Sequence, residues 1–146
     1  MEIRKMSIDD YEEVYKLWIA TPGMGLNDID DSREGIDQYL KRNPNTCFVA
    51  IESGKIAGVI LSGHDGRRGY IHHTAVSIAH RNKGIGSLLV DNTLKALKSE
   101  GIHKVALVVF RTNEIGNTFW EYKGFSERLD LVYRNIPLKE LKRIDT

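Results

Sequence analysis

The sequence predicts a mixed α/β fold, in which a mainly antiparallel central sheet with one parallel strand pair carries helices on both faces. Three observations support this fold class. Apolar residues recur at helical spacing in residues 7–43, whereas short β-branched runs dominate the middle of the chain. A long helical pattern then connects two such runs, and a strand–helix–strand crossover implies parallel pairing. No repeat, low-complexity tract or flexible linker interrupts residues 1–146, so we expect a single domain.

The N-terminal part predicts one strand followed by two helices. The strand covers residues 3–6, and Ser7 is a candidate N-cap for a helix whose apolar residues are Tyr11, Val14, Tyr15 and Trp18. Residues 21–25 contain a proline and two glycines, which end this helix. A second helix is predicted from about Asp31 to just before Pro44.

The middle of the chain predicts an antiparallel meander of three strands, over residues 47–51, 55–62 and 70–78. Glycine-containing turns join them. A helix over residues 84–100 follows, and its polar stripe is so narrow that we expect it to pack on the sheet.

The C-terminal part predicts three more strands and one more helix. Residues 105–110 are continuously apolar, which is typical of a strand buried on both faces. The helix is predicted over residues 113–123, and the last two strands over residues 125–128 and 131–136.

Composition and charge exclude several classes of protein. The 21 basic and 20 acidic residues give a net charge of +1, so charge favours neither a nucleic acid nor a membrane as partner. No stretch approaches the roughly 20 apolar residues that span a bilayer. The N-terminus lacks the apolar core of a signal peptide, so we expect a cytoplasmic protein. The single cysteine, Cys47, permits neither an intramolecular disulfide nor a multi-cysteine metal site, and we expect no metal.

The most informative segment is the turn between the third middle strand and the long helix, which reads His80-Arg81-Asn82-Lys83-Gly84-Ile85-Gly86-Ser87. Its two glycines let a ligand approach the backbone closely, and its two basic residues add positive charge. The free N–H groups and the dipole of a helix N-terminus suit a phosphate. The spacing matches neither the Walker loop nor the dinucleotide fingerprint, which needs a further glycine where Leu89 stands. The turn alone is equally compatible with an ordinary strand-to-helix connection.

Two motifs together resemble those of the GCN5-related N-acetyltransferases. The first is Arg81-x-x-Gly84-x-Gly86, which is similar to the acetyl-CoA motif of that family. The second is Asn113-x-x-Gly116-Asn117-x-Phe119-Trp120-Glu121-x-x-Gly124-Phe125. The resemblance implies the acyl-CoA N-acyltransferase fold with its parallel strand pair at the cofactor site, acetyl-CoA as co-substrate, and a primary amine as acceptor.

The resemblance also implies which residues meet acetyl-CoA: the strand before the turn hydrogen-bonds the pantetheine arm, and the backbone amides of the turn hold the pyrophosphate. The implied cofactor-binding residues are Ala75, Val76, Ser77, Arg81, Asn82, Lys83, Gly84, Ile85, Gly86, Ser87, Asn113, Gly116, Asn117 and Trp120. Helical spacing places the last four on one face of their helix, and predicts a buried apolar stripe of Ile115, Phe119 and Tyr122 on another.

The acid–base residues are less defined. Trp120 stands where many relatives carry a tyrosine that protonates the departing thiolate, and an indole N–H has no useful acidity. Tyr122 and Tyr133 are the remaining acid candidates, with water as the alternative. His72 is the predicted base, since arylalkylamine acetyltransferases carry a histidine at the matching position; a merely structural strand histidine is the alternative. Strand alternation predicts His72 and His73 on opposite faces of the sheet.

We therefore expect an N-acetyltransferase that works by direct attack of the amine on acetyl-CoA, with a CoA-binding regulatory or catalytically degenerate module as the alternative. A different nucleotide-binding domain would explain the first motif but not the second. The acceptor is expected to enter at the loop over residues 21–31, where Asp28, Asp30 and Asp31 either attract its ammonium group or are simply solvated. The sequence does not select among amine acceptors, and it leaves a homodimer open.

Overall fold

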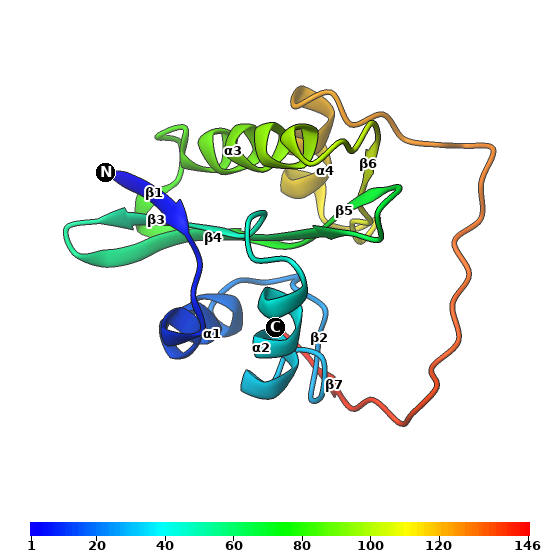
Figure 1. Ribbon diagram of the computed structural model, residues 1–146, viewed down its shortest axis with the longest axis horizontal. Helices are drawn as coiled ribbons and strands as arrows, with labels where there is room; N and C mark the ends of the chain where they lie inside the picture. Colours follow the sequence, from blue (N-terminus) through cyan, green and yellow to red (C-terminus); the bar gives the residue numbers. More distant parts are fainter.

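The computed structural model describes all 146 residues and places a five-stranded sheet between two layers of helices (Figure 1). The strands lie in the order β1-β3-β4-β5-β6. All neighbours are antiparallel except β5 and β6, which are parallel, as predicted. The bounds are Glu2–Lys5 for β1, Phe48–Glu52 for β3, Lys55–His64 for β4, Gly69–Val76 for β5 and Val105–Ala106 for β6.

Helices cover both faces of the sheet, as the sequence predicts. Helices α1 (Tyr11–Ile19) and α2 (Arg33–Arg42) lie on one face, and α3 (Ile85–Ser99) and α4 (Glu114–Tyr122) lie on the other (Figure 1). Short 3-10 turns precede α1 and α3, over Ile8–Asp10 and Ile78–His80. None of the helices combines the length and the hydropathy that a membrane crossing requires.

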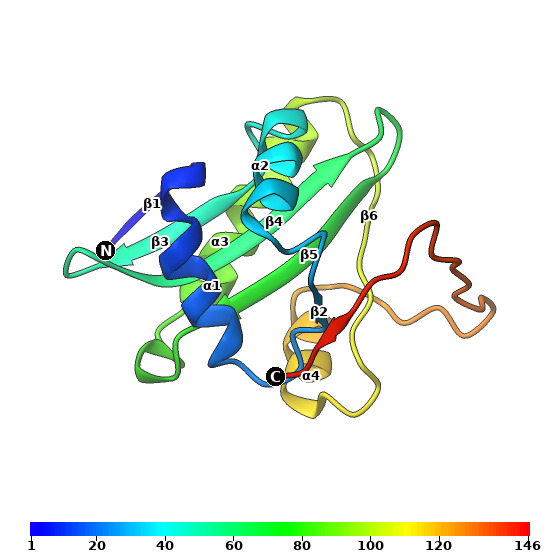
Figure 2. The ribbon, with the colours of Figure 1, turned by 90° about the horizontal axis from the view of Figure 1, so that it is seen from below.

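A second, two-stranded sheet joins the loop between α1 and α2 to the C-terminus. It consists of β2 (Leu26–Asn27) and β7 (Arg143–Ile144), which pair in antiparallel fashion. This pair lies on the side of the sheet that carries α1 and α2 (Figure 1), which is the side seen in Figure 2. The end of the chain is therefore tied to the loop that we expect to receive the acceptor.

Strand alternation builds one core on each side of the sheet. In β4, Val59 and Leu61 pack toward α1 and α2, whereas Ile60 packs toward α3. Gly58 also faces α3, where an added Cβ would lie 3.0 Å from the side chain of Leu89. The missing side chain thus lets the long helix approach the sheet closely, which explains why α3 is largely apolar.

A β-bulge interrupts the alternation in β5. Ile60 lies opposite Thr74 and Ser62 lies opposite Ile71, so two residues, His72 and His73, oppose the single Leu61. Both imidazoles therefore point toward α1 and α2, and the prediction that they lie on opposite faces is wrong. The bulge adds one residue to β5, and that residue shifts the alternation.

The C-terminal strand predictions are also wrong. Residues 125–128 and 131–136 form no strand, because the segment runs away from the sheet and finds no partner edge (Figure 1). Only Val105–Ala106 of the apolar run over residues 105–110 is a strand, and the side chain of Val108 is 59% exposed. Val105 and Leu107 pack against the core that includes α3, whereas Val108 and Phe110 on the other face stay largely exposed. High β propensity makes a strand only where an edge is available to pair.

Candidate active site

The turn between β5 and α3 forms a cradle of free backbone N–H groups. No protein group accepts a hydrogen bond from the N–H groups of residues 82–87. Two left-handed residues, Asn82 with φ 62° and Gly84 with φ 80°, bend the chain into the first turn of the helix. Concave runs of N–H groups at a helix N-terminus bind anions. The cradle therefore has the donors that a pyrophosphate needs.

Two basic residues flank this cradle, and they differ in how firmly the protein holds their side chains. Arg81 is fixed, since its Nε donates to the carbonyl oxygen of Val76 at 3.3 Å and ties the turn to the end of β5. Lys83 is exposed to solvent. Both supply positive charge, and Arg81 in addition holds the turn in place.

The structure explains in different ways why glycine stands at positions 84 and 86 of the turn. Gly84 has open space around its Cα, and its left-handed backbone explains the glycine. Gly86 is different, because an added Cβ would lie 3.3 Å from the ring of Phe119. Its missing side chain lets α4 pack against α3, and its role in the approach of a ligand stays a prediction.

The edge of β5 that faces β6 is free beside this cradle. The two strands pair only at Gly69–Tyr70 with Val105–Ala106 and then diverge. Beyond Tyr70, no strand pairs with β5 on this side, so the edge of residues 71–76 is available to an extended ligand. The backbone of Ala75 and Val76 belongs to this edge. Ser77 is less available, because its N–H donates to the carbonyl oxygen of Ala57 at 2.8 Å.

The polar residues predicted to face the cofactor from α4 also shape the start of that helix. Asn113 is the N-cap, and its Oδ1 accepts from the N–H of Gly116 at 2.9 Å. An added Cβ at Gly116 would lie 2.6 Å from Asn113 Nδ2, so the cap itself requires this glycine. Asn117 donates to the carbonyl oxygens of Phe110 and Asn113, at 3.0 and 2.8 Å. Contact of these residues with a cofactor stays a prediction.

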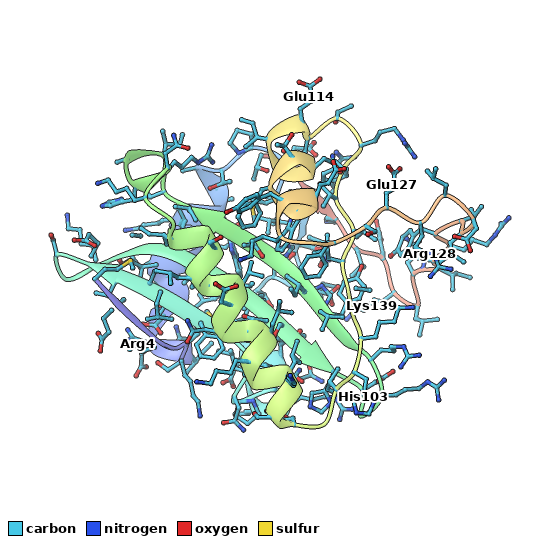
Figure 3. All side chains as sticks on the ribbon, turned by 90° about the horizontal axis from the view of Figure 1, so that it is seen from above. Arg4, His103, Glu114, Glu127, Arg128 and Lys139 are labelled. Carbon is cyan, nitrogen blue, oxygen red and sulfur yellow. The ribbon has the colours of Figure 1, made fainter.

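The apolar stripe predicted on α4 is wrong in two of its three members. Ile115 is 74% exposed and Tyr122 is 80% exposed, and only Phe119 packs inward. The packed aromatic residues are Phe119, Trp120 and Phe125, with ring centroids 5.0 and 5.2 Å apart along the series. Glu114 marks the outer end of α4 and points away from the sheet (Figure 3). The helix is short and lies at the margin of the sheet, so it buries a narrower stripe than the pattern suggests.

The face of β5 toward α1 and α2 carries the titratable side chains. Nε2 of His73 lies 2.6 Å from Oδ1 of Asp31, a residue of the loop before α2 that is only 4% exposed. The other oxygen of Asp31 accepts from the N–H of Asn27 at 2.8 Å. The hydroxyl of Tyr11 donates to the backbone carbonyl of Asp31 at 2.7 Å. Asp31 is thus not a solvated loop residue, whereas Asp28 and Asp30 are exposed.

The second imidazole lies beside the first in aromatic surroundings. The His72 ring lies edge-on to Tyr39 of α2, at 5.4 Å, and 4.6 Å from the Tyr70 ring. Part of His72 remains exposed to solvent, but the rings around it displace water. This desolvation lowers the pKa of His72 below its ordinary value of 6.5, and neighbouring His73 lowers it further while Asp31 and Asp30 oppose the shift.

Neither tyrosine proposed as the acid is held at the site. Tyr122 is the last residue of α4 and is exposed, and Tyr133 is exposed on the C-terminal segment. Trp120, at the position of the usual tyrosine, is half-buried between its aromatic neighbours. The acid roles of Tyr122 and Tyr133 stay predictions.

One continuous groove connects the N–H cradle with the two histidines. Its lining includes Gly86, Val76, His72, His73 and Asp31. Its volume of about 4180 Å³ far exceeds the roughly 300–1,000 Å³ of small-molecule sites, because the C-terminal segment runs around open space. Figure 3 shows that segment, with Glu127, Arg128 and Lys139, outside the strand that follows His103.

The chain is similar to known proteins in sequence and in fold. Residues 11–125 match the model of the Acetyltransferase (GNAT) family. The acetyltransferase plu1384 of Photorhabdus laumondii is 33% identical over 118 residues, which are 78% of each chain. Among solved structures, Ard1 from Thermoplasma volcanium has a TM-score of 0.71 at 23% identity, over 86% of this chain and 82% of that chain. The PaiA N-acetyltransferase from Thermoplasma acidophilum, solved with coenzyme A, has a TM-score of 0.71 at 20% identity, over 84% and 87%. These two similarities concern the fold.

Proposed function

Because this chain belongs to the GNAT family of acetyltransferases, we propose that it transfers the acetyl group of acetyl-CoA to a primary amine by direct attack. Acetyl-CoA supplies the thioester, and the protein supplies orientation, charge and a place for the proton. No covalent enzyme intermediate is required, and Cys47 is buried away from solvent. The acyltransferase class follows from the family, whereas the acetyl donor and the amine acceptor are our proposal.

The observation that carries the proposal is the free N–H cradle of residues 82–87 beside the free edge of β5. The cradle suits the pyrophosphate of a CoA ester, since donors and helix dipole both favour an anion. The unpaired edge suits an amide-containing chain, because pantetheine carries the amide groups that can continue a sheet. The two features are adjacent, as a molecule with a pyrophosphate and an amide arm requires.

The two histidines at the bulge support an amine as acceptor. An alkylamine has a pKa of about 10.4 in water, so it arrives as an ammonium ion and must lose a proton before it can attack. His72, the base predicted from the resemblance, is one of the two candidates, and desolvation lowers its pKa and so favours the neutral form. The exposed Asp28 and Asp30 of the nearby loop favour a cationic acceptor.

The aromatic packing of Trp120 favours one alternative, a CoA-binding regulatory or catalytically degenerate module. The position of the usual acid holds an indole, and both tyrosine candidates are exposed. A protein that binds CoA but cannot turn it over would look the same at the cradle. Protonation of the thiolate by water would make the missing acid harmless.

A thiol-release assay separates the two functions. The purified chain is incubated with acetyl-CoA and a panel of amines: a polyamine, an aminoglycoside, free lysine, and peptides with free N-termini. We expect release of CoA thiol that depends on one class of amine, and mass spectrometry should find that amine heavier by one acetyl group. Tight acetyl-CoA binding by calorimetry without any amine-dependent thiol release would instead support the module.

A homodimer is a further part of the proposal. The C-terminal segment exposes a run of large apolar side chains, which is unusual for a monomer: Leu129, Leu131, Val132, Tyr133, Ile136 and Leu138. Pairing with a second copy would cover them. Sedimentation velocity over a range of concentrations tests this, and a single monomeric species throughout would argue against it.

A further inference from the structure

The side chains of His73 and Asp31 form a hydrogen bond that no sequence motif indicates. The two residues are 42 positions apart, and the distance between Nε2 and Oδ1 is 2.6 Å. Both side chains are largely buried, at 16% and 5% exposed. The pair joins the bulge of β5 to the loop in front of α2, at the wall of the groove.

This contact selects one tautomer of the imidazole. An ionised carboxylate can only accept hydrogen bonds, so the shared proton belongs to Nε2 of His73. The lone pair of the neutral ring then lies on Nδ1. No protein group donates to Nδ1, and this nitrogen is not among the buried polar atoms that lack a partner. The ring therefore presents a free acceptor nitrogen to the groove.

We propose that His73 is the catalytic base of the acetyl transfer and that Asp31 is the residue that positions it. The inference rests on the proposed function. The ammonium of the acceptor gives one proton to Nδ1 of His73, and the neutral amine attacks the thioester carbonyl. The C–N bond forms, the C–S bond breaks, and the sulfur leaves as the CoA thiolate. After the attack the nitrogen carries one proton more than the amide retains, and this surplus proton goes to the thiolate. The amide keeps its single N–H, and imidazolium returns its proton to solvent.

The surroundings of the two histidines distinguish their roles. The side chain of His73 is held by the carboxylate on one edge, and its ring lies edge-on to Trp18 at 5.0 Å. His72 has aromatic neighbours but no hydrogen-bond partner that would select a tautomer. The titratable groups that face the pair come from every element packed around it: Tyr11 of α1, Asp30 of the loop, Tyr39 of α2, and Tyr70 and His72 of β5. Asp31 is the one that touches the ring.

The molecule contains a matched control for this geometry. His64 forms a similar contact with Glu100, with Nε2 and Oε1 2.8 Å apart. There, however, Nδ1 accepts from the N–H of Gly66 at 3.0 Å, so no lone pair remains free. His64 thus carries the same carboxylate contact without the capacity to take a proton from a substrate.

The test compares three variants in the thiol-release assay with the amine that the panel identifies. His73→Ala should lower kcat by at least about 100-fold, since general bases contribute about 10²–10⁴-fold. Added imidazole should restore part of that turnover, which a structural role would not allow. Asp31→Asn should lower kcat by at least about tenfold, because its amide donates to Nε2 and moves the proton to Nδ1. The KM for the amine should stay unchanged, so that the loss falls on kcat alone. His64→Ala should leave kcat unchanged.

A measurement on the unaltered protein covers the case in which a variant fails to fold. Imidazole ¹⁵N NMR should show His73 with its proton on Nε2, and a proton on Nδ1 would overturn the inference. Folded His73→Ala and Asp31→Asn variants with full turnover would overturn it too, while the proposed function survives. Loss of turnover in His72→Ala alone would place the base at His72. Absence of any amine-dependent thiol release from the wild type would overturn the proposed function itself, and this inference with it.

Discussion

The two sides of β5 offer different kinds of groups to a ligand. On the side of α3 and α4, the groups on offer are backbone groups, namely the N–H cradle of residues 82–87 and the unpaired strand edge. On the side of α1 and α2, they are side chains, namely two imidazoles, one of which contacts a buried carboxylate. We assign the first side to the constant part of the reaction, the CoA ester, and the second to the acceptor and its proton.

The difference shows which kind of site a sequence reveals. Backbone groups are arranged by local conformation, so the turn from Arg81 to Ser87 can be identified from contiguous residues. The side-chain site depends on Asp31 meeting His73 across 42 positions, and a bulge decides that His73 faces it. Each prediction below tests one of these sides while the other serves as the reference.

The largest effect is expected at the cradle. Gly86→Glu places a negative charge and a large side chain at the first turn of α3, where the pyrophosphate should bind. We expect the acetyl-CoA Kd to rise at least about 30-fold, or about 2 kcal/mol, measured by calorimetry. Gly86→Ala is the control, because its Cβ only presses on the Phe119 ring at 3.3 Å, and it should change Kd less than about threefold. Equal effects of the two substitutions would point to helix packing and against an anion site.

A smaller effect is expected at the start of α4, where a double-mutant cycle tests whether the Asn113 cap requires a glycine at position 116. Asn113→Ala should lower the free energy of unfolding by about 1 kcal/mol, because it removes the N-cap of α4. Gly116→Ala in the wild type should give no gain, since its Cβ collides with the Asn113 amide. In the Asn113→Ala background the same substitution should stabilise the protein by up to about 1 kcal/mol through helix propensity. Urea denaturation measures all four corners, and additive values would contradict the steric role of Asn113.

Loosening the contact between β7 and the loop before α2 should change binding of the amine acceptor and leave acetyl-CoA binding unchanged. Asp28 exchanges two hydrogen bonds with the backbone of Lys142, at 2.7 and 3.0 Å, and so holds the loop beside β7. Asp28→Ala removes one of them, and we expect KM for the amine to rise about threefold, or about 0.7 kcal/mol, with the acetyl-CoA Kd unchanged. Asp37→Ala, which removes only an exposed ion pair with Lys41 on α2, is the control. A matching rise in the acetyl-CoA Kd would show that the two sides are coupled.

The smallest effect is a pH dependence of stability that belongs to His72. Desolvation lowers the pKa of His72 in the folded chain below the 6.5 of the free imidazole, so the unfolded chain binds the proton more readily. Stability should therefore fall as the pH drops below about 6.5. His72→Gln should flatten this dependence between about pH 7 and pH 5, measured by chemical denaturation, whereas exposed His103→Gln should not. An unchanged slope in His72→Gln would assign the proton uptake to another group.

The sequence by itself determined the fold class, the order of the elements through α4 except for the short β2, and the glycine-containing turn before α3. It did so because these features depend on local patterns: hydrophobic period, caps, and glycines that the backbone requires. Gly84 is an example, since its left-handed φ follows from the turn itself. The family resemblance rests on the same contiguous motifs, and it is confirmed by the match over residues 11–125.

Only the tertiary structure decided the rest. The bulge that turns His72 and His73 to one face depends on the register between β4 and β5, and strand alternation cannot reveal an extra residue. The contact of Asp31 with His73 depends on how a loop folds back on the sheet. The apolar residues 131–136 form no strand because no edge pairs with them, although their propensity favours one. A strand and a buried hydrogen bond between distant side chains are both properties of two segments together, and neither segment encodes its partner.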